Sequence, residues 1–323
     1  IQDSHNPSSA TRNSDNRIIG NYVGTDVTGT RIYPYTKNGI ASDTTTAGVD
    51  LKDGATDIEV AYNVIGGNFG GVIIWGFERQ SPQRAYVHDN LIGIGVNGER
   101  LPNDLYGVRI GDLVHDARIE RNIIANNGVG VQLLSSARVH NRISQNAIYA
   151  NTGLGIDLSP SGVNPNDSGD NDSGPNDLLN FPVLQQVSTA EVSGTACAGC
   201  TVEIFAADQA AGSNGSGQRF VGAGLADASG QFVALVNGVQ VGEVLTATAI
   251  DKLGNTSEFA RNVAAVQGST PGVPTPTLPP ALGTPTIGPV ETVPPAATPI
   301  PSTPTVAPAP ELNPRLYLPG VQR

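Results

Sequence analysis

A short phrase recurs five times in the first half of this sequence and limits its fold more than any other feature. The phrase is [Ile/Val]-x-x-Asn-x-[Ile/Val], followed by Gly-[Val/Ile]-x-[Ile/Leu], and its asparagines are Asn21, Asn63, Asn90, Asn122 and Asn146. The accompanying glycines are Gly48, Gly71, Gly107, Gly130 and Gly155. Where nothing is inserted, one copy follows the last after 23 to 25 residues. A fixed period in this range predicts stacked supersecondary units, none of which can bury its apolar side alone.

Each repeat contains two short stretches in which apolar residues alternate with others. Ile119 and Ile124 mark the first stretch of one repeat, and Val131 and Leu133 mark the second. Alternation with period two places one face inward, and stretches this short between Gly and Asn turns favour strands of about three to five residues. A leucine-rich repeat has a similar period but needs a leucine framework, which is absent. The sequence therefore predicts an all-β fold, a parallel β-helix with internal columns of Ile, Val and Leu.

The recurrent asparagines and glycines are interpreted as scaffold. An Asn at the same turn of every coil can hydrogen-bond its equivalents above and below, which satisfies the turn amides. The five asparagines are therefore predicted to form a ladder. The glycines mark turns that need positive φ or close approach of two backbones.

Composition narrows the classes of partner. Net charge is −11 and the 18 basic residues are dispersed, which argues against nucleic acid. No apolar run approaches the roughly 20 residues that span a bilayer. The sequence contains no Met and opens at Ile1 without a charged and then apolar leader. We interpret it as a fragment or mature form that lacks earlier coils.

Two repeats carry long insertions, and these are predicted to form a binding face. Asn63 to Gly71 is 8 residues, whereas Asn21 to Gly48 is 27 and Asn90 to Gly107 is 17. Both insertions leave the stack at the same corner, and insertions gathered on one face often bind ligands. The candidate ligand-binding residues are Tyr33, Tyr35, Arg100, Asp104 and Tyr106. Tyrosines with Asp and Arg suit sugars, although ordinary polar hairpins would look the same.

Three segments resemble a known family. They are Asn21-Tyr-Val-Gly-Thr-Asp-Val-Thr-Gly-Thr30, the stretch from Gly155-Ile-Asp-Leu158 to Phe181-Pro-Val183, and Leu245-Thr-Ala-Thr-Ala-Ile-Asp-Lys-Leu-Gly-Asn-Thr-Ser-Glu-Phe259. They are similar to bacterial secreted proteins with a right-handed parallel β-helix of the pectin-lyase-like fold and a C-terminal Ig-like module. The resemblance implies this architecture and an extracellular or cell-envelope setting. It implies no single activity, because many functions share the scaffold.

Four regions are predicted along the chain. Residues 1–182 form the β-helix with an Asp/Asn-rich exit loop, and 183–267 form a small Ig-like β-sandwich of strands such as Val202-Glu-Ile-Phe-Ala. Sixteen of the 24 prolines lie from Pro271 onward, which predicts a disordered Pro/Thr-rich stalk over 268–314. Residues 315–323 resemble a short terminal tag for envelope attachment.

The two cysteines are predicted to form a local disulfide. Cys197 and Cys200 stand in Cys-Ala-Gly-Cys and are the only cysteines of the chain. Two ligands cannot close a zinc site, and a thioredoxin-like role needs a βαβ context that is missing. A disulfide agrees with an oxidising compartment.

Two outward faces of the repeat bear on catalytic chemistry. The column Asp50, Ile73, Arg109, Gln132 and Asp157 contains no adjacent acid pair. On another face, His88 is predicted to stand over Glu120, and Asp89 over Arg121. His88, Glu120 and Arg121 are thus the candidate catalytic residues. The alternative is a set of cross-coil surface pairs, each contributing little.

The exit loop is the candidate metal site. Asp167, Asp170, Asp172 and Asp177 alternate with Asn and Gly, and hard oxygen ligands on a flexible loop suit calcium. The EF-hand spacing fails, because Ser168 and Ser173 stand where Asp and Gly are required. Asp and Asn that simply form turns are the alternative.

Three functions follow from these observations. The first is a secreted or envelope-attached protein that binds polysaccharide or surface partners without catalysis. The second is a carbohydrate-active enzyme, a polysaccharide lyase or glycoside hydrolase, whose site lies partly on missing coils. The third is a structural spacer.

Overall fold

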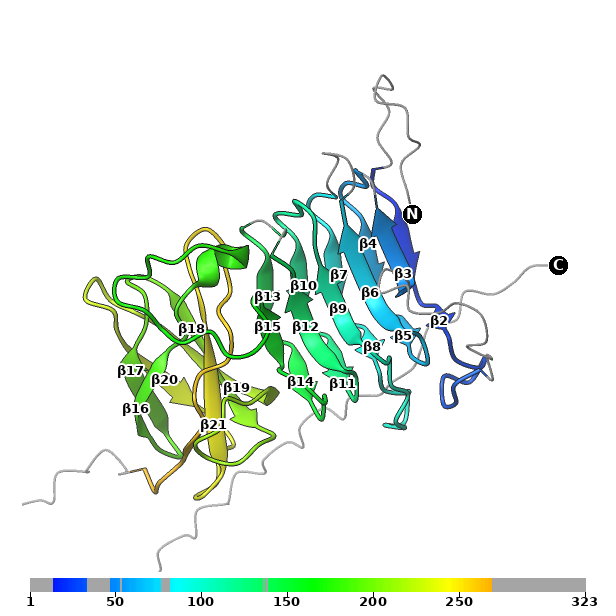
Figure 1. Cartoon of the computed structure of the whole chain (residues 1–323). Helices are drawn as coiled ribbons and strands as arrows, with labels where there is room; N and C mark the ends of the chain where they lie inside the picture. Colours follow the sequence, from blue (N-terminus) through cyan, green and yellow to red (C-terminus); the bar gives the residue numbers. More distant parts are fainter. Residues whose placement is uncertain are drawn as a thin grey trace, which may run out of the picture. The chain divides into compact units, whose positions relative to one another are not determined.

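The computed structural model describes residues 14–33, 47–52, 54–76, 82–135, 137 and 139–268. All of them belong to the first of two units, Ile1–Val273 and Pro274–Arg323. In this part of the chain regular structure is almost entirely β-strand (Figure 1), and no helix in it is long and apolar enough to cross a membrane. The predicted stalk beyond Gly268 and the predicted tag over 315–323 lie outside the described residues.

The first half folds into three parallel sheets of five strands each, and each coil gives one strand to each sheet (Figure 1). The first sheet contains β1 (Arg17–Ile19), β4 (Glu59–Ala61), β7 (Tyr86–His88), β10 (Arg118–Glu120) and β13 (Arg142–Ser144). The second contains β2 (Tyr22–Val23), β5 (Val64–Ile65), β8 (Leu91–Ile92), β11 (Ile123–Ala125) and β14 (Ala147–Tyr149). The third contains β3 (Ala47–Lys52), β6 (Gly70–Trp75), β9 (Tyr106–Ile110), β12 (Val129–Leu133) and β15 (Ile156–Leu158). This arrangement is consistent with the predicted β-helix solenoid, and we call it the stack.

The core of the stack is built from columns of apolar side chains in register. Ile119 pairs with Val87 on one side and Ile143 on the other, and Val131 pairs with Val108 and Ile156. These side chains are almost entirely buried and belong to one cluster. The positions that the alternating pattern placed inside are therefore inside, because a period of two sends every second side chain to the same face.

Asparagine ladders form hydrogen bonds with the backbone N–H and C=O groups at the corners between the sheets. In the predicted ladder, Asn122 Oδ1 accepts from the backbone N–H of Asn90 at 3.0 Å, and Asn122 Nδ2 donates to Asn146 Oδ1 at 3.0 Å. The same pattern joins Asn21 to Asn63 and Asn63 to Asn90, so the ladder is confirmed over all five coils. A second ladder, which the sequence interpretation missed, joins Asn68, Asn103, Asn127 and Asn151 at the next corner.

The second half forms one antiparallel sheet of seven strands, in the order β16-β17-β20-β19-β18-β21-β22. The strands are β16 (Val183–Val187), β17 (Glu191–Thr195), β18 (Thr201–Ala207), β19 (Gly217–Leu225), β20 (Gln231–Val236), β21 (Val244–Ile250) and β22 (Val263–Ala264). A bridge from Ser188 to Val266 links the two ends of this order. Antiparallel strands were expected here, but they hydrogen-bond as one sheet rather than the two sheets of a sandwich. The 3₁₀ turn η1 (Pro175–Leu178) precedes the domain.

The seven-stranded domain covers the end of the stack. Thr256 Oγ1 accepts from Ile143 N at 2.9 Å, and Glu258 Oε1 accepts from Leu158 N at 3.0 Å. Asp208 Oδ2 accepts from Ala150 N, just after β14, at 2.7 Å. Each of the three sheets thus has a backbone N–H of its last coil satisfied by a side chain of the domain. Because exposed strand edges pair with other chains, such a cap protects a solenoid.

Candidate functional site

One outer face of the stack carries a strip in which most side chains are charged or aromatic. It lies on the sheet of β1, β4, β7, β10 and β13, on both sides of the buried central Ile or Val. The residues before that central position are Arg17, Glu59, Tyr86, Arg118 and Arg142, in register from coil to coil. Those after it are Ile19, Ala61, His88, Glu120 and Ser144. We call these ten residues the strip.

The residue after each of these strands turns the chain sharply and stands beside the strip. Asp89, Arg121 and Gln145 have φ values of 54°, 53° and 53°, in the left-handed region. This conformation costs a non-glycine residue about 1–2 kcal/mol. The ladder asparagine that follows each of them holds the turn, so the strip gains a further column of side chains.

His88 is enclosed by carboxylates and an aromatic ring. Its side chain is 7% exposed, Nδ1 lies 2.7 Å from Asp89 Oδ2, and Nε2 lies 3.1 Å from Glu59 Oε1. The imidazole stacks on the Tyr86 ring with the centroids 3.9 Å apart. A hydrogen bond from Arg17 holds the pKa of Glu59 below its ordinary value. Both nitrogens of His88 therefore have a carboxylate partner within the protein.

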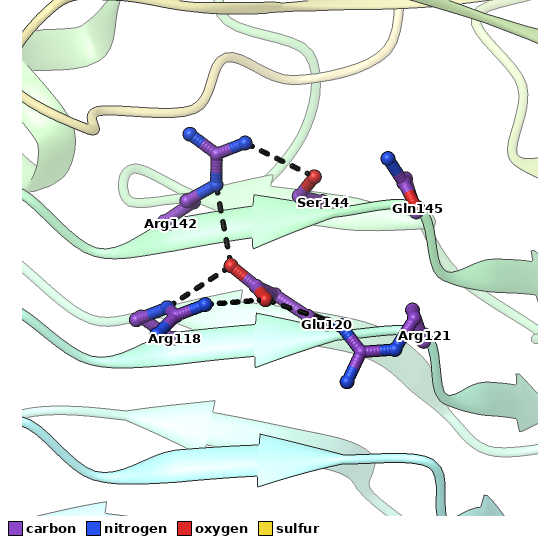
Figure 2. A pocket seen from close by; sticks show the side chains of 6 residues that line it. All are labelled: Arg118, Glu120, Arg121, Arg142, Ser144 and Gln145. Atoms are coloured by element: carbon purple, nitrogen blue, oxygen red, sulfur yellow. Dashed lines mark hydrogen bonds and ion pairs between the residues drawn. The ribbon is translucent and has the colours of Figure 1, made fainter. Parts of the chain in front are cut away.

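Three guanidinium groups surround the Glu120 carboxylate (Figure 2). Arg118 Nη2 lies 2.8 Å from Glu120 Oε2, Arg142 Nε lies 3.3 Å from Oε1, and Arg121 Nη1 lies 3.4 Å from Oε2. Arg121 also donates to Asp89 Oδ2 at 2.9 Å. The Glu120 side chain is only 9% exposed, whereas the three arginine side chains are 40–52% exposed. The carboxylate thus lies beneath guanidinium groups that reach solvent.

These groups line a pocket of about 300 Å³, which we call the arginine pocket. Its lining residues are Arg118, Glu120, Arg121, Arg142, Ser144 and Gln145 (Figure 2). Among the lining residues, three guanidinium groups face one carboxylate, and Arg121 is also paired with Asp89. Guanidinium groups present planar pairs of N–H donors that match carboxylate, sulfate or phosphate oxygens. The arrangement can therefore hold an anionic group, and the amide of Gln145 adds neutral hydrogen-bonding capacity.

The sequence-predicted catalytic candidates lie together on this face, but in other pairings. His88 stands in register with Glu120, and Asp89 binds Arg121, as expected. However, His88 bonds Glu59 and Asp89, and Glu120 bonds the arginines. The sequence interpretation missed Arg118 and Arg142. Their signal is the position before the central apolar residue of the strand, where Arg17 also stands.

The described part of the first insertion lies beside the second, on the same side of the stack, as predicted. A bridge from Thr25 to Ile32 closes a hairpin in the first, and a bridge from Ile94 to Arg100 closes one in the second. Residues 34–46 of the first insertion lie outside the described residues. Val96 N donates to Gly29 O at 3.2 Å, which joins the two hairpins. They follow β2 and β8, strands of the same sheet, so they leave from the same corner.

The candidate ligand-binding residues have different environments. Tyr33 is 62% exposed, and Arg100 and Asp104 are also exposed. Tyr35 lies outside the described residues. Tyr106 was predicted to belong to the exposed insertion, and this is wrong. It is the first residue of β9 and is completely buried, and the Arg109 guanidinium lies 3.9 Å from its ring centroid.

Three of the four candidate calcium ligands lie together. A carboxylate oxygen from each of Asp167, Asp170 and Asp172 falls within 4.8 Å of the others. Burial, with the nearby carboxylates adding to it, raises the pKa of Asp170. Asp177 is not part of this group, and its Oδ2 accepts from Asn255 Nδ2 at 3.2 Å. Such a group is typical of a calcium site, although exposed acidic loops without an ion look similar.

The structure also links the two cysteines. Cys197 and Cys200 form a disulfide, as predicted.

Comparison with known protein families finds no family model that matches this chain. The fold and the arginine pocket are therefore the basis on which function is argued.

Proposed function

We propose that this protein binds acidic polysaccharide without transforming it, and that the arginine pocket holds an acidic group of the glycan. The observation that carries the proposal is the grouping of Arg118, Arg121 and Arg142 around one carboxylate at the surface. Carboxylated and sulfated glycans offer repeated anionic groups on a hydroxyl-rich chain. Arginine forks suit the anions, and Ser144 and Gln145 suit the hydroxyls.

The excess of acidic residues in the whole chain does not oppose this proposal. The net charge of −11 is spread over 323 residues. At physiological ionic strength, charges farther apart than about 8 Å are strongly screened. A glycan in the pocket would therefore respond mainly to the three arginines beside it, and its affinity should fall as salt is added.

The geometry of His88 favours binding over acid–base catalysis. A general base needs a nitrogen within reach of the substrate proton. Both His88 nitrogens are engaged by carboxylates, and the side chain is nearly buried. Glu120 is engaged by three guanidinium groups. Neither group is presented to a ligand as a proton acceptor.

The wider architecture extends the proposal. The resemblance to secreted right-handed β-helix proteins of the pectin-lyase-like type supports an extracellular or cell-envelope protein, with the seven-stranded domain in the place of the Ig-like module. The disulfide between Cys197 and Cys200 agrees with this, because such bonds persist in oxidising compartments.

The test is calorimetric titration with polygalacturonate, a carboxylated chain, and dextran sulfate, a sulfated one. We expect Arg118→Gln and Arg142→Gln each to weaken binding roughly tenfold or more, as loss of a charge-assisted contact predicts. Arg17→Gln is the matched control, because it removes an equal charge from the same face at the far end of the strip. Equal losses of affinity in all three variants would contradict binding in the arginine pocket. If Tyr33→Ala weakens glycan binding and Arg118→Gln does not, the glycan binds at the hairpins and not in the arginine pocket.

Product analysis separates the alternatives. Release of unsaturated or reducing ends from either polymer would identify a lyase or hydrolase. A protein that neither binds nor cleaves acidic glycans would be a structural spacer.

A further inference from the structure

A buried carboxylate of the seven-stranded domain lies directly behind the arginine pocket. Glu203 is the third residue of β18 and is 2% exposed. Its Oε1 accepts from Ser144 Oγ at 2.6 Å, and its Oε2 accepts from the backbone N–H of Gln145 at 2.9 Å. Ser144 and Gln145 both line the pocket. Glu203 therefore holds two lining residues without lining the pocket itself.

The surroundings of Glu203 give it no cation in contact. Its neighbours in register are Thr248 on β21 and Ala223 on β19, which carry no charge. From the stack, Arg142 and Glu120 are the charged groups that act on it, with opposite signs. Among the described residues no ion pair involves Glu203. Burial accordingly raises its pKa above the ordinary value of a glutamate.

We propose that Glu203 is a positioning residue that makes the arginine pocket a pH-dependent anion site, which holds its anion more tightly as the solution is acidified. The proposal rests on the binding function proposed above. When Glu203 is ionised, it accepts the hydrogen bond of the Ser144 hydroxyl and places a negative charge next to two lining residues of the pocket. When Glu203 is protonated, that charge is gone, and the Ser144 hydroxyl is free to donate to a bound anion.

The magnitude follows from one unit charge near the bound group. Salt screens a buried charge such as Glu203 less than an exposed one, so at a separation of about 10 Å and an effective dielectric constant of about 20, removing it changes affinity by up to roughly tenfold. The guanidinium groups of the pocket keep their charge across this pH range. The imidazole of His88 also lies near, in register with Glu120. The share of the pH dependence that belongs to Glu203 is therefore the share that Glu203→Gln removes.

The experiment measures the dissociation constant of dextran sulfate between pH 5 and 8, because its sulfates keep their charge throughout. Unmodified protein should bind more tightly as the pH falls, by up to roughly tenfold once Glu203 is protonated. Glu203→Gln keeps the shape and an acceptor for Gln145 N, so it should bind tightly at neutral pH and have a flatter pH profile than the unmodified protein. Ser144→Ala removes only the hydroxyl and should keep most of the pH dependence. If Glu203→Gln does not fold, Ser144→Ala still reports on Glu203, because the ionised carboxylate loses a hydrogen-bond donor and the midpoint of the pH profile should move to higher pH.

The outcomes separate this proposal from the binding function. One outcome is that Arg118→Gln loses binding while Glu203→Gln keeps the pH profile of the unmodified protein. This overturns the role of Glu203 and leaves the binding function standing. A flat profile in the unmodified protein does the same. Absence of binding at every pH overturns both proposals. Thermal unfolding of each variant shows whether a changed affinity reflects a damaged fold.

Discussion

The asparagine ladder predicts a large loss of stability when one of its central members is shortened. Asn122 is 1% exposed. Its Oδ1 accepts from the backbone and side-chain nitrogens of Asn90 at 3.0 and 2.9 Å. Its Nδ2 donates to Val87 O, Glu120 O and Asn146 Oδ1 at 2.9–3.1 Å. Asn122→Ala removes all of these bonds in a region that water does not reach.

The size of the loss can be worked from these contacts. Each buried polar group left without a partner costs about 1–3 kcal/mol. The substitution leaves the Asn90 N–H without an acceptor and removes a donor from the carbonyl groups of Val87 and Glu120. We therefore expect the free energy of unfolding to fall by about 3–5 kcal/mol. Asn21→Ala is the matched control at the outer end of the ladder, where the exposed side chain makes one such bond, to Asn63. Its loss should stay near or below about 1 kcal/mol.

Urea unfolding measures both variants against the unmodified protein. Trp75 is the single tryptophan and lies on β6, so its fluorescence reports on the stack. The slope of free energy against urea must also be compared, because a repeat array can lose two-state behaviour. Equal losses for Asn122→Ala and Asn21→Ala would refute the reasoning, since burial of the ladder would then contribute nothing.

Three further predictions concern the cap, a corner and the exit loop. Burial raises the pKa of Glu258 to about 7 from an ordinary 4.5, so the folded state holds this proton more tightly than the unfolded state does. The protonated Glu258 carboxyl therefore contributes fully to stability below about pH 4.5, and this contribution is lost as the pH rises towards 7. In urea unfolding across this range, the unfolding free energy of the unmodified protein should decline more steeply than that of Glu258→Gln. Parallel curves for the two proteins would contradict this. Ala150 is exposed with a φ of 52°, so Ala150→Gly should raise the unfolding free energy by up to about 1 kcal/mol, and a lower melting temperature would contradict this. Calcium bound by Asp167, Asp170 and Asp172 should raise the melting temperature, and a chelator should reverse the rise. If calcium leaves the melting temperature unchanged, these aspartates do not form a calcium site.

The repeat predicted the scaffold well because a single local rule determines it. Alternate apolar residues such as Val131 and Leu133 must face inward wherever the coil lies in the stack. The ladder asparagines were equally readable, since their spacing relative to the apolar positions is constant. The second ladder was less visible. The hairpin between Asn90 and Asn103 interrupts its spacing, although Asn127 and Asn151 follow the first ladder at the same interval.

The arginine pocket was harder to predict because it depends on pairings between coils and between domains. Arg118 and Arg142 occupy an outward column that looks like ordinary surface until Glu120 is placed between them. Glu203 is the one charged residue of the mostly apolar and buried strand β18, which makes it unusual in the sequence. Its partner Ser144 lies 59 residues earlier in the chain. No local pattern connects the two, so only the contact between domains shows what the carboxylate does.

The position of the pocket ties anion affinity to the integrity of the cap. The arginine pocket lies on the last two coils, where the seven-stranded domain meets the stack. An ionised Glu203 accepts the Gln145 N–H, but burial disfavours its charge, and the same charge repels an anion in the pocket. Because burial raises the pKa of Glu203, the folded state favours the protonated carboxyl. Acidification should therefore strengthen anion binding and the hold of the cap on β13 together.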